Sequence, residues 1–366
     1  MKLWQILLVV ALGVGYGLIE PGRLAYAFGH ATLYVFLPAL LFEAAWNLNY
    51  RAILRQWIPI AALAGPGVVL TALIVAAALA IVRVPFGPAL LAGAILSATD
   101  PIAVVAIFRR LRVPKTLVTI VECEALFNDA VAVAIYRGTL VALTLGAAGA
   151  GGIALVALDT LAGAVAGTAL GIAIAFVAAR ALRRTRDVRL QIAATVLCAY
   201  GAYFAAEYLH LSGIFATIAC GIALRYFERS WLTLRIAEDV NAFWDLAALV
   251  ANVLVFFMVG AALQIGRIAE EPVFTVACIA AVAVARFAVA AFLLPGPYPR
   301  SWMAVVRTAG VRGGLSLALA LAIPASFPYR EAIVDATFAV ALATLAAGGL
   351  TMERAARRTL RQTPSG

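Results

Sequence analysis

Apolar runs of about 20 residues recur along the whole chain, separated by short gaps that contain arginine, glycine or proline. An α-helix needs a run of about this length to cross the hydrocarbon core of a bilayer. The chain is 65% hydrophobic and 13% charged, whereas soluble domains are near 45–50% apolar and about 25% charged. We therefore expect an all-α polytopic membrane protein, embedded in the lipid bilayer. Its twelve or so predicted transmembrane helices lie at 3–20, 30–47, 57–82, 87–108, 115–143, 153–180, 189–208, 212–227, 240–264, 272–294, 301–323 and 331–350.

Basic residues are distributed unevenly among the gaps. The gaps after even-numbered predicted spans hold 19 Lys and Arg, and those after odd-numbered spans hold five. Because cytoplasmic loops carry the excess of Lys and Arg, we expect a multi-pass protein of the inner (plasma) membrane with both termini in the cytoplasm. The net charge of +10 is spread over these gaps rather than gathered into one patch, which argues against a nucleic-acid partner.

Motifs of soluble enzymes and of resident metal sites are absent from the sequence. The four cysteines and two histidines are scattered, and no Cys-x-x-Cys, His-Glu-x-x-His, Walker A loop or Gly-x-Ser-x-Gly elbow occurs. We therefore expect no enzyme activity and no cofactor. Residues 1–366 are expected to form a single integral membrane transport unit without a soluble domain, in which residues 351–366 form a short basic cytoplasmic tail.

Two predicted spans are interrupted at corresponding places. Thr99, Asp100 and Pro101 interrupt the fourth span, and the glycine-rich segment 310–314 interrupts the eleventh. Proline cannot donate a backbone hydrogen bond, so the break frees backbone groups inside the membrane. Interrupted spans at matching positions of two halves are typical of inverted-repeat transporters, whose binding site lies near the midplane.

The most polar stretch within an apolar helix is Glu-Cys-Glu-Ala-Leu-Phe-Asn-Asp at 122–129. A charge at the bilayer centre costs at least roughly 2.5–3.5 kcal/mol, so a functional role is the first interpretation. Asp129 lies about 14 residues, or roughly 21 Å of helix, beyond Lys115, which places it near the middle of the membrane. A buried carboxylate there can bind either a proton or a small hard cation such as Na⁺. The alternative is a protonated structural aspartate that is hydrogen-bonded within the bundle.

A polar network is predicted around this aspartate. Glu124 lies one turn before Asn128, so the two side chains can meet. Arg312 is the expected partner of Glu124, because an unpaired buried charge is costly, and we interpret this pair as structural. Three further charged residues in apolar surroundings are expected to be paired structural groups: Glu207, Asp245 and Arg286.

Three other polar residues are each open to two roles. Thr99 can offer a hydroxyl or carbonyl oxygen to a cation. Asp100 is expected to cap the half-helix that follows it, with direct ion binding as the alternative. Glu43, about 13 residues into the second span, is either an ion ligand or a residue near the membrane interface.

Six segments spread over nearly the whole chain resemble hallmark motifs of the NhaP-type sodium/proton antiporters. This group belongs to the monovalent cation:proton antiporter-1 family, which includes the sodium/hydrogen exchangers of animals. The segments are Leu-Pro-Ala-Leu-Leu-Phe-Glu (37–43), Ser-Ala-Thr-Asp-Pro-Ile-Ala-Val (97–104), Glu-Cys-Glu-Ala-Leu-Phe-Asn-Asp (122–129), Ala-Glu-Tyr-Leu-His-Leu-Ser-Gly (206–213), Phe-Trp-Asp-Leu-Ala (243–247) and Gly-Val-Arg-Gly-Gly-Leu-Ser-Leu-Ala-Leu-Ala (310–320). Their order along the chain makes the resemblance strong, although each motif alone is weak.

The resemblance implies an inverted-repeat antiporter fold with two crossed discontinuous helices. It implies a homodimer in which each protomer has scaffold or dimerisation helices and a six-helix core, here around 87–143 and 301–350. The core of such proteins carries its ion across the membrane in an elevator motion.

The resemblance also implies roles for single residues. Asp129 matches the carboxylate that binds ion and proton in turn, and Asn128 lies beside it. Thr99 and Glu43 match further ligands of the transported Na⁺, which is cargo and not a structural metal. Glu124 with Arg312 matches a buried pair, and an Asn-Asp motif usually accompanies electroneutral one-for-one exchange.

Two features depart from the family pattern. Ala125 stands where relatives commonly have serine, so no hydroxyl is available one turn before Asp129. An additional N-terminal span found in many relatives is not apparent, which bears on the expected dimer interface.

The sequence thus predicts a secondary antiporter that exchanges Na⁺, or Li⁺, for H⁺ through competition at a buried carboxylate. A potassium/proton antiporter on the same scaffold is the first alternative. A cation channel is a second, although the chain has no Thr-Val-Gly-Tyr-Gly filter. A third is an intramembrane aspartyl protease, for which Asp100 and Asp129 would have to lie on facing helices.

Overall fold

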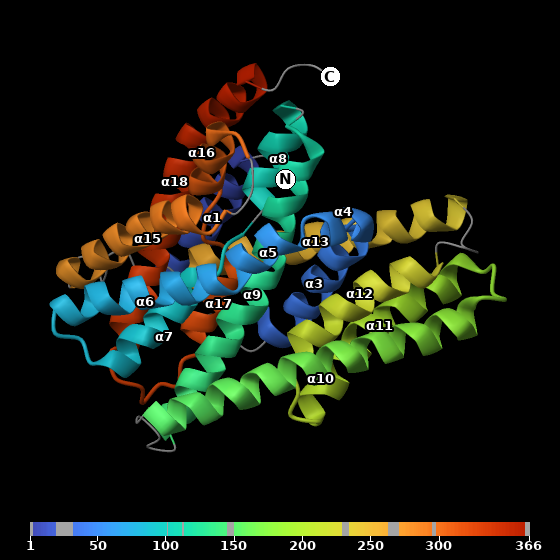
Figure 1. Ribbon diagram of the computed structural model, residues 1–366, viewed down its shortest axis with the longest axis horizontal. Helices are drawn as coiled ribbons and strands as arrows, with labels where there is room; N and C mark the ends of the chain where they lie inside the picture. The colour runs from blue at the N-terminus through green and yellow to red at the C-terminus, as the bar shows by residue number, and fades with distance from the viewer. Residues whose placement is uncertain are drawn as a thin grey trace. The chain divides into compact units, whose positions relative to one another are not determined.

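The computed structural model describes residues 3–19, 32–100, 102–111, 113–144, 150–228, 234–262, 271–294 and 298–362. These residues form helices joined by turns and short irregular segments, and no strand occurs among them (Figure 1). The predicted all-α architecture is confirmed.

The helices follow the predicted spans closely. Their bounds are α1 (Leu3–Ile19), η1 (Thr32–Phe36), α3 (Leu37–Asn47), α4 (Tyr50–Arg55), α5 (Trp57–Ala64), α6 (Pro66–Ile81), α7 (Phe86–Ser97), α8 (Ile102–Leu111), α9 (Lys115–Thr144), α10 (Ala150–Leu182), α11 (Val188–Tyr208), α12 (Gly213–Glu228), α13 (Leu234–Ala262), α15 (Pro272–Phe292), α16 (Arg300–Thr308), α17 (Gly314–Leu321) and α18 (Arg330–Gln362). Within the described residues, six helical segments are long and apolar enough to cross a membrane: Trp57–Ile81, Ala157–Leu182, Val188–Tyr208, Arg235–Met258, Pro272–Phe292 and Arg330–Arg357. The total of twelve spans stays a prediction.

The chain divides into two compact units. One unit comprises residues 1–30, 51–143 and 255–366, and the other comprises residues 31–50 and 144–254. Both predicted core regions, 87–143 and 301–350, belong to the first unit.

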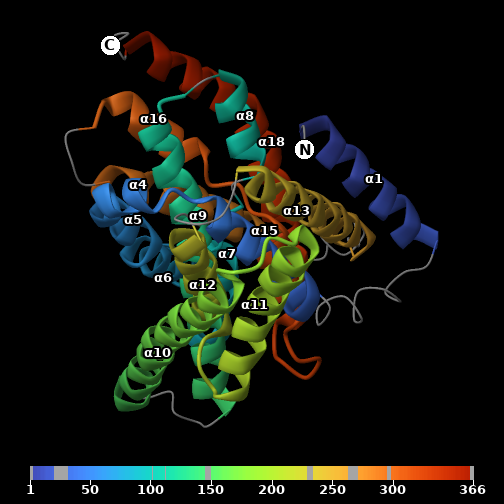
Figure 2. The same cartoon turned by 90° about the vertical axis from the view of Figure 1, so that its right-hand side faces the viewer.

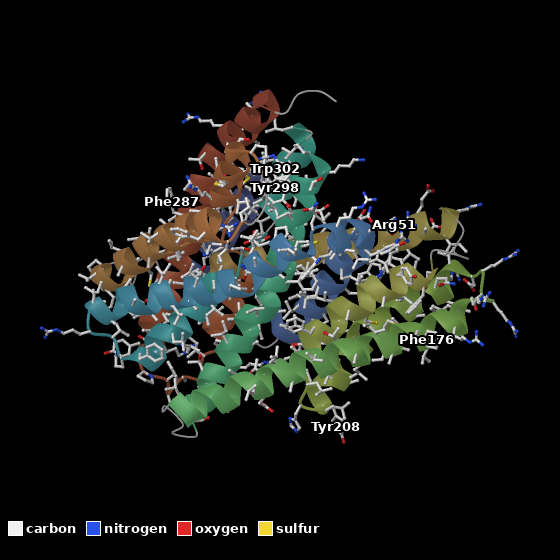
Figure 3. The ribbon with its side chains drawn as sticks, viewed as in Figure 1. Arg51, Phe176, Tyr208, Phe287, Tyr298 and Trp302 are labelled. Carbon is white, nitrogen blue, oxygen red and sulfur yellow. The ribbon has the colours of Figure 1, made fainter. Side chains whose placement is uncertain are left out.

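The first unit is held together by helices that are far apart in sequence. α6 packs along α7 and α15, and α18 packs against α15, α16 and α17. An extensive apolar cluster in this unit includes Phe108 of α8, Ile120 of α9 and Val305 of α16, all fully buried. At its edge Tyr298 and Trp302 stack with ring centroids 4.9 Å apart (Figure 3).

The second unit is built on α3, α10, α11 and α12. Both ribbon views show α10, α11 and α12 running alongside one another (Figures 1 and 2). α10 and α12 approach closely because Gly171 has no Cβ, which would overlap the Ala216 carbonyl oxygen. An aromatic group fills the interior next to them, where Phe42 and Trp244 have ring centroids 4.8 Å apart.

Two predicted boundaries differ from the structure. The third span is not one helix, because α5 ends at Ala64 and α6 begins at Pro66, which has no N–H for the preceding turn. The last span does not end near residue 350. α18 continues to Gln362, where Met352 and Ala356 bury its apolar side, so most of the predicted basic tail is helical.

Candidate ion site

The fourth predicted span breaks where the sequence predicts it. α7 ends at Ser97, α8 begins at Ile102, and residues 98–100 are not helical. Ala98 has extended backbone angles of φ −60° and ψ 138°. The Asp100 N–H donates to the Val311 carbonyl over 2.8 Å, so this break is hydrogen-bonded directly to the break in the eleventh span.

The eleventh span breaks between α16, which ends at Thr308, and α17, which begins at Gly314. A Cβ on Gly313 would overlap the Asp100 carboxylate, so only glycine allows this approach. Asp100 therefore lies at the N-terminus of α17, where the helix dipole stabilises a negative charge. The sequence predicts that Asp100 caps the half-helix that follows it. The structure places Asp100 at the start of a second helix, α17.

Arg312 also forms hydrogen bonds at this crossing. Its Nε donates to the Leu96 carbonyl and its Nη1 to the Gly310 carbonyl, each over 2.7 Å. The Leu96 carbonyl lies in the last turn of α7, where a cation is favourable. The predicted pairing of Arg312 with Glu124 is wrong, because Glu124 pairs with another arginine and Arg312 donates to these two carbonyls instead.

The partner of Glu124 is Arg286 on α15. Arg286 Nη1 and Nη2 donate to the two carboxylate oxygens over 2.6 and 3.1 Å, and both residues are buried. The sequence carried a signal for this pair, since Arg286 is the one charged residue in Pro272–Phe292. The prediction that Arg286 is a paired structural group is confirmed, but the sequence does not identify Glu124 as its partner.

Asp129 and Asn128 on α9 reach the break between α7 and α8. Asn128 Nδ2 donates to Thr99 Oγ1 over 3.3 Å, and the Asp129 carboxylate accepts a hydrogen bond from the Thr99 backbone N–H. Two oxygen atoms, Asn128 Oδ1 and Asp129 Oδ1, are buried and have no hydrogen-bond partner in the described part of the chain. Thr99 and Asn128 are almost fully buried, whereas Asp129 is half-buried.

Glu43 belongs to the other compact unit. It lies half-buried on α3, and its Oε1 accepts from Asn47 Nδ2 over 2.7 Å. The structure thus brings Asp129, Asn128, Thr99, Asp100 and Arg312 together around one crossing. The role of Glu43 as an ion ligand stays a prediction.

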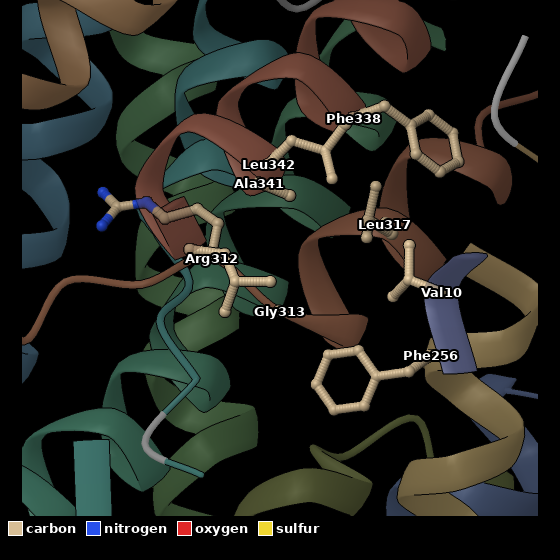
Figure 4. A pocket seen from close by; sticks show the side chains of 9 residues that line it. Val10, Phe256, Arg312, Gly313, Leu317, Phe338, Ala341 and Leu342 are labelled. Atoms are coloured by element: carbon tan, nitrogen blue, oxygen red, sulfur yellow. The ribbon is translucent and has the colours of Figure 1, made fainter. Parts of the chain in front are cut away.

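A small cavity of about 20 Å³ lies behind Arg312 (Figure 4). Val10, Phe256, Leu317 and Phe338 line it, and the Arg312 guanidinium points away from them. It has room for about one water molecule but lacks the polar partners that a water or an ion requires. The candidate ion site is therefore the group of oxygen atoms at Thr99, Asn128 and Asp129.

Two interrupted helices that cross beside buried carboxylates define the class of protein as a secondary transporter. The family model "Sodium/hydrogen exchanger, transmembrane" matches residues 2–358. The Na⁺/H⁺ antiporter NhaH of Halobacillus aidingensis is 33% identical over 325 residues, which cover 87% of this chain and 80% of that protein. ApNhaP of Aphanothece halophytica is 34% identical over 361 residues, covering 95% of this chain and 68% of that protein.

Among solved structures, the sodium/proton antiporter MjNhaP1 of Methanocaldococcus jannaschii has the same fold. The two structures superpose with a TM-score of 0.81 at 20% sequence identity, over 97% of this chain and 92% of that one. The chain belongs to the sodium/hydrogen exchanger family. It is therefore a transporter and not an enzyme.

Proposed function

We propose that this protein is a secondary antiporter that exchanges Na⁺ or Li⁺ for H⁺ across the membrane. Asp129 holds either a proton or the cation, so binding of one releases the other. The core around 87–143 and 301–350 moves as an elevator to expose the site on alternate sides, in a homodimer. The names of the relatives, which are Na⁺/H⁺ antiporters, support Na⁺ and H⁺ as the exchanged ions.

The observation that carries this proposal is a pair of buried oxygens, Asn128 Oδ1 and Asp129 Oδ1, for which the described part of the chain offers no hydrogen-bond partner. Hard cations prefer oxygen ligands, and a buried oxygen without a partner is costly unless a ligand satisfies it. Thr99 Oγ1 already accepts from Asn128 and keeps further acceptor capacity. Because Ala125 offers no hydroxyl, water or backbone oxygen completes the coordination shell.

Charge balance supports one-for-one exchange. Among the described residues, the charged side chains at the crossing are two arginines, 286 and 312, and three carboxylates, at 100, 124 and 129. With all of them ionised, one negative charge remains. One proton or one monovalent cation neutralises it, so the occupied site carries the same charge with either substrate, and exchange is electroneutral.

The test is proton flux in proteoliposomes that contain a pH-sensitive dye. Na⁺, Li⁺ and K⁺ are added in turn across roughly pH 6 to 9, with and without an ionophore that clamps the membrane potential. We expect flux with Na⁺ and Li⁺ that the clamp leaves unchanged. A response to K⁺ alone would establish the potassium/proton alternative, and cation current without proton flux would establish a channel.

A further inference from the structure

One peptide unit at the break is hydrogen-bonded at both ends. Its N–H, from Thr99, donates to the Asp129 carboxylate. Its carbonyl, from Ala98, accepts from Ser316 Oγ over 3.3 Å. Because a peptide unit is planar, its N–H cannot rotate without moving the carbonyl, so the two bonds depend on each other.

Ser316 is built into the crossing. It is 1% exposed and lies in the first turn of α17, four residues after Arg312 in the chain. Arg312 Nε holds the Leu96 carbonyl, and Ser316 Oγ holds the Ala98 carbonyl two residues later. The two side chains therefore fasten the end of α7 to the eleventh span on either side of Ser97.

We propose that Ser316 is a positioning residue for the ion site: it fixes the Ala98–Thr99 peptide so that the Thr99 N–H points at Asp129. This inference rests on the proposed function. The same peptide leads into Thr99, whose side-chain oxygen accepts from Asn128 Nδ2 over 3.3 Å, so the orientation of the peptide decides where the oxygen atoms of the site lie. Without the Ser316 hydroxyl, the Ala98 carbonyl loses this partner, the peptide is free to turn, and the oxygen atoms that bind the cation are held less precisely.

Cation affinity in the proteoliposome assay tests this role. For Ser316→Ala we expect the apparent KM for Na⁺ to rise about fivefold, the effect of losing one hydrogen bond, with the maximal rate within about twofold of wild type. Ser316→Thr keeps the hydroxyl and should restore most of the affinity.

Ser97→Ala is the matched control. Ser97 is also 1% exposed, but its hydroxyl bonds to Ala94 within α7, so KM should stay at the wild-type value. If Ser316→Ala proves too unstable to assay, Ser316→Cys replaces it, and its weakly donating thiol should give an intermediate rise in KM.

The proposal would be overturned by an unchanged KM in Ser316→Ala, or in the Cys variant that replaces it. Equal changes of KM in Ser316→Ala and Ser316→Thr would also overturn it. Asp129→Asn, assayed alongside, reports on the proposed function alone. Retained exchange in that variant contradicts the function. Lost exchange there, with an unchanged KM in Ser316→Ala, contradicts only the positioning role.

Discussion

Asn128 Nδ2 donates to Thr99 Oγ1 over 3.3 Å, and this bond joins α9 to the irregular segment between α7 and α8. In this orientation of the amide, Asn128 Oδ1 is buried and has no hydrogen-bond partner in the described residues. One amide thus links the two elements with its nitrogen and leaves its oxygen available to a cation.

Asn128→Ala removes both functions of that amide. We expect Na⁺-dependent proton flux to fall on the order of tenfold or more, the effect of losing a buried hydrogen bond together with one ion ligand. Thr139→Val is the control on the same helix, because Thr139 Oγ1 bonds only to the Ile135 carbonyl of α9. Equal flux in the two variants would contradict the role of Asn128.

Either single substitution in the Glu124–Arg286 pair should destabilise the protein strongly. Glu124→Ala or Arg286→Ala leaves a buried charge unpaired, which costs about 3–5 kcal/mol. Replacing both residues with methionine should cost far less, since no charge is then left behind. Thermal unfolding of the purified protein in detergent measures these differences.

Glu353 and Arg357 provide the comparison for that pair. They form an exposed pair one turn apart on α18, with a closest distance of 2.8 Å. Glu353→Ala should change stability by less than about 1 kcal/mol. If the buried and exposed single variants unfold at the same temperature, the buried pair does not have the structural role assigned to it.

Gly313→Ala should disrupt the crossing through the added Cβ alone. The added Cβ would overlap the Asp100 carboxylate, so the two breaks would have to separate. We expect proton flux to fall by on the order of a hundredfold, since small misplacements at a site can cost that much. Gly201→Ala is a control with nothing within 4 Å of its added Cβ, and it should transport normally. Wild-type flux in Gly313→Ala would contradict the close approach of the two breaks.

Glu228 makes the stability of the folded protein depend on pH. It is the last residue of α12 and lies one residue past the span predicted at 212–227. Burial raises the pKa of its carboxyl from 4.5 to about 8, and Arg225 opposes that rise only in part. The folded protein therefore retains a proton that the unfolded chain has already lost. Its stabilising effect is complete below the unfolded pKa of 4.5 and declines as pH rises toward about 8.

We therefore expect the unfolding temperature in detergent to fall by on the order of 5 °C as pH rises through this window. Glu228→Gln should flatten that part of the curve, because glutamine does not titrate. Glu238→Gln, at an exposed position of α13, should leave it unchanged. Parallel curves for Glu228→Gln and wild type would show that Glu228 does not carry the effect.

Local signals in the sequence predicted most of the fold. Thr99, Asp100 and Pro101 predicted the break after α7, and the apolar runs predicted most helix ends to within a few residues, with the start of α13 and the end of α18 as the main exceptions. Helical spacing also placed Asn128 and Asp129 in the polar stretch of α9. These features depend on neighbours in the chain, which a sequence shows directly.

The partners of buried charges could not be predicted in the same way. Two arginines, 286 and 312, were available to Glu124, and spacing along one helix does not indicate which of them faces it across the bundle. The correct partner is 162 residues away in the chain. The Ser316 bond to Ala98 was missed for the same reason, since 218 residues separate them.

If one proton and one cation compete for Asp129, binding of the cation releases the proton, and this release can be measured. Na⁺ is added to the purified protein in weakly buffered detergent solution, and the released protons are titrated. We predict release of about one proton per bound Na⁺ in wild type and none in Asp129→Asn. Proton release that persists in Asp129→Asn would contradict the account, because the exchanging carboxylate would then lie elsewhere.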